Sequence, residues 1–186
     1  MSVIHVVDDD ETLRVALTRL LNAEGYEVRT YASAGDFLLQ KPRSGCVVLD
    51  LQMPGPSGLE LQQALSLPIV FLTGHGDIES GVRAMKAGAV DFLTKPVEPA
   101  ALLKAVQAAL ARHAEQENLD RARTRYEALT ARERSVFEHV VAGKANKEIA
   151  RALGISERTV KMHRAQVMEK MQAGSVAELV RLVTIG

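Results

Sequence analysis

The chain lacks most of the features that mark secreted, membrane and zinc-binding proteins. Its 186 residues include one cysteine, Cys46, which excludes an internal disulfide; its apolar surroundings predict a small buried hydrophobe, with a reactive thiol as the alternative. The cysteine and the histidines show no spacing typical of zinc ligands. No uncharged apolar run approaches the length of a bilayer span, and the amino terminus enters a strand pattern without a basic region or a cleavage signal. We therefore expect a cytoplasmic protein with no membrane partner.

Net charge is also absent, but the charges cancel unevenly along the chain. Residues 1–111 contain 9 Lys or Arg and 13 Asp or Glu, whereas residues 112–186 contain 14 and 10, so the two parts have charges of −4 and +4. All six prolines lie in the first part. A chain of this length forms one or two domains, and these contrasts predict two domains of different architecture.

The first part alternates apolar strand patterns with helical patterns. Ser33 and Ser57 suit the N-cap positions of the second and third helices, and Gly25 and Gly88 suit the ends of the first and fourth. This alternation predicts an α/β fold, with a five-stranded parallel doubly wound sheet covered on both faces. The strands are predicted at 3–7, 27–31, 46–49, 68–72 and 91–94, and the helices at 11–23, 34–40, 58–65, 77–87 and from 99 onward.

Chemically active side chains follow four of these strands. In a parallel sheet the carboxyl ends of the strands lie at one edge, where open α/β folds bind their ligands. Three neighbouring carboxylates repel one another unless a cation lies among them, and Mg²⁺ is a hard ion that such oxygens prefer. An ammonium and a hydroxyl suit the oxygens of a phosphoryl group, and a lone aspartate on a central strand suits its acceptor. The residues are Asp8, Asp9 and Asp10 after the first strand, Asp50 (the candidate acceptor) after the third, Thr73 after the fourth and Lys95 after the fifth.

Two interpretations remain open for the segment that joins the two parts. Neither Gly nor Pro occurs between Pro99 and Gly143, and apolar residues keep a helical spacing on both sides of a polar run at 114–118. The fifth helix therefore either continues through this segment as one rod of about 30 residues or breaks within the polar run.

The second part contains a helix-turn-helix pattern. Four helices are predicted at about 131–142, 146–153, 157–171 and 175–184. Gly154 supplies a left-handed turn residue between the middle two, and Ser156 caps the longer helix that follows. Between Lys144 and Lys170 there are seven cationic and three acidic residues. A cationic second helix suits the DNA major groove, whereas the alternative is a solvated face in a plain helical bundle.

Together these motifs resemble two-component response regulators of the FixJ and NarL class, and they are closest to the FixJ branch. The resemblance implies a flavodoxin-like receiver domain over 1–115, a helical linker over 116–128 and an all-α LuxR-type helix-turn-helix domain over 129–186. The matching motifs are Asp8-Asp9, Asp50 with Met53-Pro54 and Gly58, Thr73, Gly74-His75-Gly76-Asp77, Lys95-Pro96, Leu129-Thr130-Ala131-Arg132-Glu133, Asn146-Lys147-Glu148-Ile149-Ala150 and Thr159-Val160-Lys161-Met162-His163.

The resemblance also implies roles for residues of the receiver. Asp9, Asp50 and the backbone carbonyl of Gln52 would ligate Mg²⁺, and Asp8 would act largely through water. A sensor histidine kinase would phosphorylate Asp50. Thr73 would then move toward the phosphoryl group, and the ring of Phe92 would turn inward behind it. The resemblance further implies a cis peptide bond between Lys95 and Pro96, as is usual in this class.

For the second part the resemblance implies double-stranded DNA as a partner. Phosphorylation would favour a homodimer through the fourth helix, fifth strand and fifth helix, and RNA polymerase would be a further partner. The implied DNA-contacting residues are Lys161, Met162 and Ala165 toward base edges, and Lys147, Arg158 and Thr159 toward phosphates.

The sequence departs from the family pattern at one flank of the site. From Asp50 to Thr73 the chain is several residues shorter than most relatives, which predicts a truncated third helix or following loop. Two rival functions remain: a phosphohydrolase that uses the same aspartate and Mg²⁺, and a constitutive DNA-binding protein whose receiver no longer accepts phosphate. The absence of a recognisable cap or specificity pocket disfavours the first, and the intact acceptor set disfavours the second.

Overall fold

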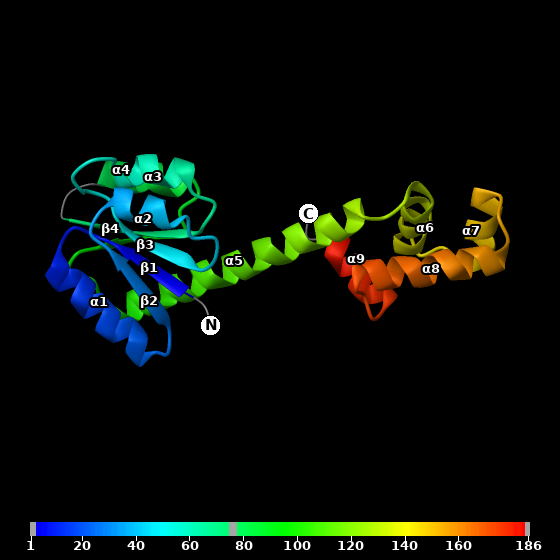
Figure 1. The fold of residues 1–186 in the computed structure, drawn as a ribbon, viewed down its shortest axis with the longest axis horizontal. Helices are drawn as coiled ribbons and strands as arrows, with labels where there is room; N and C mark the ends of the chain where they lie inside the picture. The colour runs from blue at the N-terminus through cyan, green and yellow to red at the C-terminus, as the bar shows by residue number, and fades with distance from the viewer. Residues whose placement is uncertain (1–2, 75–77, 185–186) are drawn as a thin grey trace. The chain divides into compact units, whose positions relative to one another are not determined.

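The structure of the chain, a computed structural model, describes residues 3–74 and 78–184, except for the side chains of residues 78, 183 and 184. Contacts between residues divide the chain into two compact units, Met1–Ala114 and Glu115–Gly186. Figure 1 shows a sheet with helices in the first unit and helices alone in the second. No described helix is both long and apolar enough to cross a membrane.

The first unit is the parallel doubly wound sheet that the alternation of patterns predicts. Its strand order is β2-β1-β3-β4-β5, and all neighbouring strands run parallel. The order reverses between β1 and β3, which is where folds of this type bind ligands. Its elements are β1 (Val3–Val7), α1 (Glu11–Ala23), β2 (Glu27–Tyr31), α2 (Ala34–Gln40), β3 (Cys46–Asp50), α3 (Gly58–Ala64), β4 (Ile69–Thr73), α4 (Ile78–Lys86), β5 (Asp91–Thr94) and the first half of α5 (Pro99–Glu127).

Each face of the sheet has its own apolar core. Alternate side chains of a strand point to opposite faces, so Ile4 and Val6 pack with α1 and α5, whereas Val7 packs with α2, α3 and α4. Strands β3 and β4 are buried along their whole length, as expected for central strands of a parallel sheet. Cys46 is one of these buried residues, and burial raises the pKa of its thiol to about 12. This environment is that of a buried hydrophobe.

Local capping explains where several helices begin. The carboxylate of Asp10 accepts hydrogen bonds from the backbone N–H groups of Thr12 and Leu13 at the start of α1. Ser33 caps α2, and Ser57 forms a capping box with Glu60 at the start of α3. Helix α3 has seven residues, and helix α4 begins at residue 78; residue 77, the predicted start, lies outside the described residues.

The second unit contains the end of α5 and four further helices. Helix α5 is continuous from Pro99 to Glu127, so the described chain has no break in the polar run at 114–118. Apolar residues from all five segments form one core. The segment predicted as a linker over 116–128 falls within this unit, with Ala122 buried and Tyr126 packed against the core. The four helices are α6 (Ala131–Val141), α7 (Asn146–Leu153), α8 (Glu157–Met171) and α9 (Val176–Thr184).

The turn between α7 and α8 has the predicted helix-turn-helix geometry. Gly154 ends α7 with φ 64° and ψ 37°, a left-handed conformation that suits glycine. The backbone N–H of Ile155 then donates to Ala150, and Ser156 caps α8 by accepting a hydrogen bond from the N–H of Thr159. These hydrogen bonds fix the conformation of the turn between the two helices.

Candidate functional site

Three carboxylates meet at the carboxyl ends of two neighbouring strands. Asp8 and Asp9 follow β1, Asp50 ends β3, and these strands are paired in the sheet. One oxygen of each carboxylate lies within 4.8 Å of the others. Asp8 and Asp50 are buried, and Asp9 is exposed. The cluster therefore lies at the point where the strand order reverses, with one member open to solvent.

Lys95 joins the two buried carboxylates. Its Nζ donates to Oδ2 of Asp8 at 2.7 Å and to Oδ2 of Asp50 at 2.8 Å. Burial disfavours the charged ammonium, but the hydrogen bonds and negative charges of these two partners outweigh it and raise the pKa of Lys95. The backbone N–H of Lys95 also donates to the carbonyl of Thr73 at 2.7 Å, and its peptide bond to Pro96 is cis, as the resemblance predicts. The ammonium is thus a fixed cation at the strand edge.

The backbone orients both buried carboxylates. The N–H of Asp10 donates to Oδ1 of Asp8 at 2.9 Å, and the N–H of Gln52 donates to Oδ1 of Asp50 at 3.1 Å. Burial raises the pKa of Asp8, and the hydrogen bonds from Lys95 and Asp10 offset only part of this effect. Two carboxylates that are each held at both oxygens form a preorganised acidic site.

The acidic cluster suits a divalent cation. Carboxylate oxygens are hard ligands, and three of them this close together repel unless positive charge lies nearby. Lys95 provides one such charge. Asp9 receives no hydrogen bond from the residues that the structure describes, so its oxygens are available as ligands on the exposed side of the cluster. The donor set of Asp8, Asp9 and Asp50 therefore fits Mg²⁺.

The two predicted switch residues lie on the strands beside this cluster. Thr73 ends β4 and is 1% exposed, and its hydroxyl donates to the carbonyl of Gly74 at 3.2 Å. Phe92 lies on β5 and packs partly buried against the core on the α4 side of the sheet. His75, Gly76 and Asp77, from the predicted Gly74–Asp77 motif, lie outside the described residues.

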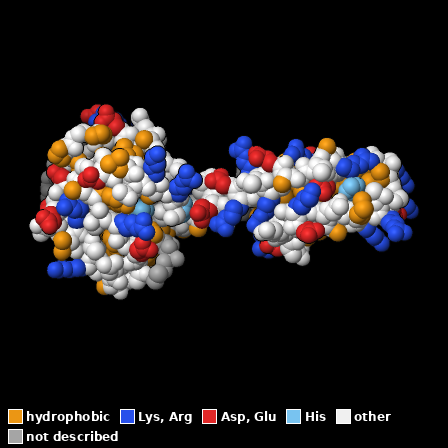
Figure 2. All heavy atoms as spheres, in the orientation of Figure 1, with side chains coloured by type: hydrophobic (Ala, Val, Ile, Leu, Met, Phe, Trp, Pro, Cys, Tyr) orange, Lys and Arg blue, Asp and Glu red, His pale blue; other side chains and the backbone are white. Residues whose placement is uncertain are grey.

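The basic surface of the second unit lies on the helix-turn-helix. Lys161 and Met162 are adjacent on α8 and lie three or four residues from both Arg158 and Ala165, so the four residues share one face of that helix, and all four are exposed. The Met162 side chain is 50% exposed. Lys147 is also exposed, and Thr159 is half-buried at the start of α8. Figure 2 shows Lys and Arg side chains gathered over the end of this unit where α7 and the start of α8 lie.

Two cations of this unit have partners that the sequence did not reveal. Arg164 donates to the side-chain oxygen of Asn146 at 2.7 Å and so joins α8 to α7. Lys170 donates at 2.7 Å to Glu133, a buried residue of α6, and together with the N-cap of that helix it lowers the pKa of Glu133. These two positive charges stabilise the unit, so the surface that can face an anionic partner is smaller than the charge count suggests.

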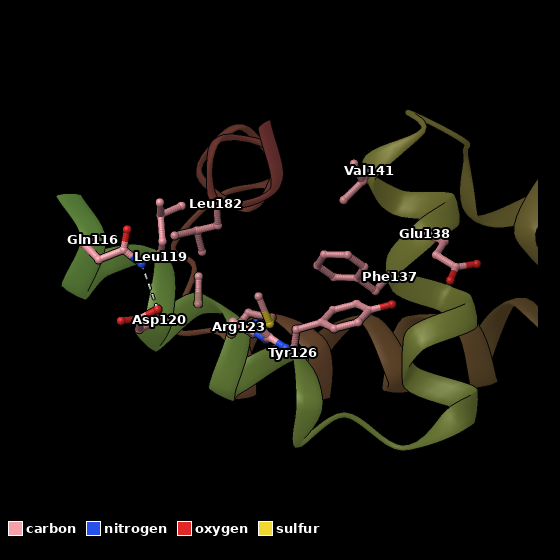
Figure 3. Close-up of a pocket in the computed structure, with 11 residues that line it drawn as sticks. Gln116, Leu119, Asp120, Arg123, Tyr126, Phe137, Glu138, Val141 and Leu182 are labelled. Atoms are coloured by element: carbon pink, nitrogen blue, oxygen red, sulfur yellow. Dashed lines mark hydrogen bonds between the residues drawn. The ribbon is translucent and has the colours of Figure 1, made fainter. Parts of the chain in front are cut away.

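The second unit also contains a concavity whose lining includes none of the predicted DNA-contacting residues. It has a volume of about 630 Å³ and is enclosed by the end of α5 and parts of α6, α8 and α9. Figure 3 shows Tyr126 and Phe137 side by side within it, and their ring centroids lie 5.1 Å apart. Its lining is mainly apolar, and the residues described there include no cluster of metal ligands.

Comparisons with known protein families match both units. Residues 4–107 match the response regulator receiver domain, and residues 127–183 match the luxR family of bacterial regulatory proteins. The chain is 46% identical to the transcriptional regulatory protein FixJ of Azorhizobium caulinodans, with 98% of this chain and 92% of that protein covered. It is 43% identical to the response regulator protein TodT of Pseudomonas putida, with 97% and 85% covered.

Solved structures give the same result. The response regulator StyR is 45% identical, with a TM-score of 0.72 and 98% of each chain covered. Full-length FixJ from B. japonicum is 42% identical, with a TM-score of 0.59 over 99% of this chain and 96% of that one.

Proposed function

The chain belongs to the family of FixJ-like two-component response regulators, and from this membership we propose that it is activated by transfer of a phosphoryl group from a sensor histidine kinase to Asp50. It is a transcription factor with a receiver domain and a LuxR-type DNA-binding domain, and its relatives are transcriptional regulators. We place the receiver at 1–115, a helical linker at 116–128 and the DNA-binding domain at 129–186. A DNA-binding regulator must reach the chromosome, so we assign the protein to the cytoplasm.

The observation that most strongly supports Asp50 as the phosphoryl acceptor is the pair of hydrogen bonds that Lys95 donates to Asp8 and Asp50. One ammonium contacts both Asp8 and Asp50, so Lys95 can balance the charge of the acceptor before transfer and hold a phosphoryl oxygen after it. Asp50 ends a central buried strand, and the N–H of Gln52 fixes its other oxygen. Positioning and charge compensation are the main requirements of phosphoryl transfer, and these residues meet both.

We assign Mg²⁺ to Asp8, Asp9, Asp50 and the backbone carbonyl of Gln52. When bound, the ion neutralises negative charge on the carboxylates and on the incoming phosphoryl group. Asp9 offers the exposed carboxylate, whereas the hydrogen bonds from Lys95 and Asp10 to Asp8 favour a contact through water for that residue. Thr73 supplies a hydroxyl on the neighbouring strand for another phosphoryl oxygen.

Phosphorylation would act by shifting an equilibrium between two receiver states. In the activated state the Thr73 hydroxyl contacts the phosphoryl group and the Phe92 ring turns inward behind it. This rearrangement alters the surface formed by α4, β5 and α5, through which two copies associate. Only a difference in stability between the two states can drive the change, and the new contacts of Thr73 provide that difference.

In the DNA-binding domain we assign base contacts to Lys161, Met162 and Ala165. These residues share an exposed face of α8; Lys161 and Met162 lie in its first half and Ala165 lies just past its midpoint. The second helix of a helix-turn-helix enters the major groove, where its side chains contact base edges. Lys147, Arg158 and Thr159 lie at the starts of α7 and α8, where they suit phosphate contacts. Two such domains in a dimer would bind two DNA half-sites, and the bound dimer would then contact RNA polymerase.

Asp50→Asn tests this function directly, because it keeps the size of the side chain and removes the acceptor. We expect wild-type protein to dimerise at least about tenfold more tightly with beryllofluoride and Mg²⁺, and the variant not to respond. Sedimentation equilibrium measures the dimer constant, and circular dichroism checks that the variant is folded. Equal responses of the two proteins would remove Asp50 from the mechanism.

A further inference from the structure

Helix α4 contains a buried glycine that faces the switch aromatic. Gly81 is the fourth residue of α4, and it is buried although most of its neighbours on the helix are exposed. Glycine inside a helix is less stable than alanine because it loses more conformational freedom on folding. A glycine at such a position therefore indicates that something occupies the space of its missing side chain.

The Phe92 ring occupies that space. A β-carbon at Gly81 would lie 2.6 Å from Cζ, 2.7 Å from Cε1 and 2.9 Å from Cε2 of Phe92. Three adjacent ring carbons at nearly equal distances mean that the β-carbon would lie over the face of the ring at its far end. Two carbons in favourable contact are about 3.5–4.0 Å apart. With the ring in this position, only glycine fits.

This ring position accompanies the resting arrangement of the other switch residue. The Thr73 hydroxyl donates its hydrogen bond to the neighbouring carbonyl of Gly74 and not to a group at the acidic cluster. The Phe92 ring lies against Gly81 of α4. Both features are those expected before phosphorylation.

From this contact, and on the basis of the proposed function, we propose that Gly81 is a positioning residue that holds the receiver in its resting state by providing a socket for the Phe92 ring. The ring leaves the socket when it turns inward. The stability of the ring against Gly81 therefore sets the fraction of unphosphorylated protein that is in the activated state. A side chain at position 81 changes that fraction without contacting Asp50 or Lys95.

The variant Gly81→Ala tests the socket, because its methyl group excludes the ring. We expect the unphosphorylated variant to dimerise at least about fivefold more tightly than the wild type, and the added gain from beryllofluoride and Mg²⁺ to be smaller by the same factor. The double variant Gly81→Ala with Phe92→Ala should dimerise like Phe92→Ala alone, because the methyl group then meets no ring. Sedimentation equilibrium of the full chain measures all four proteins.

Gly35→Ala is the matched control. Gly35 also lies in a helix of the receiver, but a β-carbon there would have only the Ser33 hydroxyl oxygen within 4 Å, at 3.7 Å. This variant receives the same gain in helix propensity without a clash, so its dimer constant should equal that of the wild type. A similar rise in both variants would attribute the effect to helix stability and overturn the proposal.

The ring itself can be observed independently. The chain has four phenylalanines, so 4-fluorophenylalanine labelling gives four fluorine resonances, and Phe92→Leu identifies one of them. We expect the Phe92 resonance of unphosphorylated Gly81→Ala to move toward its position in wild-type protein with beryllofluoride. An unchanged resonance, or a shift away from that position, would overturn the proposal.

The remaining outcomes separate this proposal from the proposed function. Wild-type protein that does not respond to beryllofluoride would refute the function itself. A wild-type response together with Gly81→Ala behaving as wild type would refute only the socket. If Gly81→Ala does not fold but the double variant does, the Phe92 ring cannot leave the space beside Gly81 in the folded protein, and the proposal is overturned. If neither variant folds, a wild-type Phe92 resonance that stays unchanged during dimerisation overturns the proposal, and one that shifts supports it.

Discussion

His5 is a buried titratable residue on β1 that the acidic cluster does not use. It is 2% exposed, and Nε2 donates to the carbonyl of Ser44 at 3.2 Å. With its proton on Nε2, the other ring nitrogen accepts from the Tyr31 hydroxyl at 3.1 Å. The ring also packs edge to face on Phe37, with centroids 5.7 Å apart. Its environment therefore suits neutral imidazole.

Burial lowers the pKa of His5, and the hydrogen bond to Ser44 offsets only part of this effect; the smaller effects of the Arg29 and Glu27 charges lower and raise it, respectively. The unfolded chain then binds a proton more readily than the folded one. The stabilising contribution of neutral His5 is present above a pH of about 6.5 and is lost as the pH falls through the lower folded pKa.

We expect His5→Gln to reduce the free energy of unfolding by about 1–2 kcal/mol at neutral pH. We also expect the variant to lose less stability than the wild type between neutral pH and a pH of about 5. Urea unfolding at a series of pH values measures both effects. Parallel pH profiles for the two proteins would show that His5 does not titrate on unfolding.

At the scale of elements, the end of α5 is joined to the end of α8. Arg125 of α5 donates to the carbonyl of Met171 at 3.3 Å and to the side-chain oxygen of Gln172. Gln172 ends α8 in a left-handed conformation, with φ 53°. A cation at this end of a helix satisfies free carbonyls and opposes the helix dipole. The α5 segment before the matched luxR-family residues therefore supports the helix assigned to DNA.

Arg125→Ala should weaken this end of α8. We expect a loss of about 0.5–1.5 kcal/mol in the free energy of unfolding of the DNA-binding unit, together with weaker DNA binding. Arg123→Ala is the control, because its side chain is 81% exposed and its ion pair with Glu127 lies at the surface. Urea unfolding and fluorescence anisotropy measure the two effects. Equal losses for both variants would reject a specific role for Arg125.

At the scale of the whole molecule, the proposed function requires two separate units to share one equilibrium. Each unit has its own apolar core, and α5 contributes residues to both units. If phosphorylation raises DNA affinity by some factor, thermodynamic linkage requires DNA to raise the affinity for the phosphoryl analogue by the same factor. The coupling can therefore be measured from the receiver side.

We expect a DNA fragment selected for specific binding to tighten the binding of beryllofluoride, with Mg²⁺ present, by on the order of 5- to 150-fold. Titration calorimetry with and without the fragment measures this factor. Random DNA of equal length should have a smaller effect, because most of its binding comes from phosphate contacts. Identical titrations with the selected fragment and without DNA would mean that the two units are not coupled.

The sequence by itself determined where the helices and strands lie. All five strands and all nine helices of the described chain fall within one or two residues of the predicted ranges, apart from the carboxyl end of α5, which was left open. Hydrophobic period and capping residues act within a few positions of the chain, so they can be read without knowledge of distant contacts. The meeting of Asp8, Asp50 and Lys95 follows from the same reasoning, because parallel strands end at one edge.

Only the tertiary structure decided which side chains pair across elements. Lys170 and Arg164 belong by sequence to a basic helix, yet Glu133 and Asn146 bind them. Gly81 looks like a weak point in a helix until the Phe92 ring is placed against it. Such contacts join residues from 11 to 37 positions apart, and they depend on the distances and angles at which helices and strands pack. Those distances and angles depend on the complete fold, so a short stretch of sequence does not reveal them.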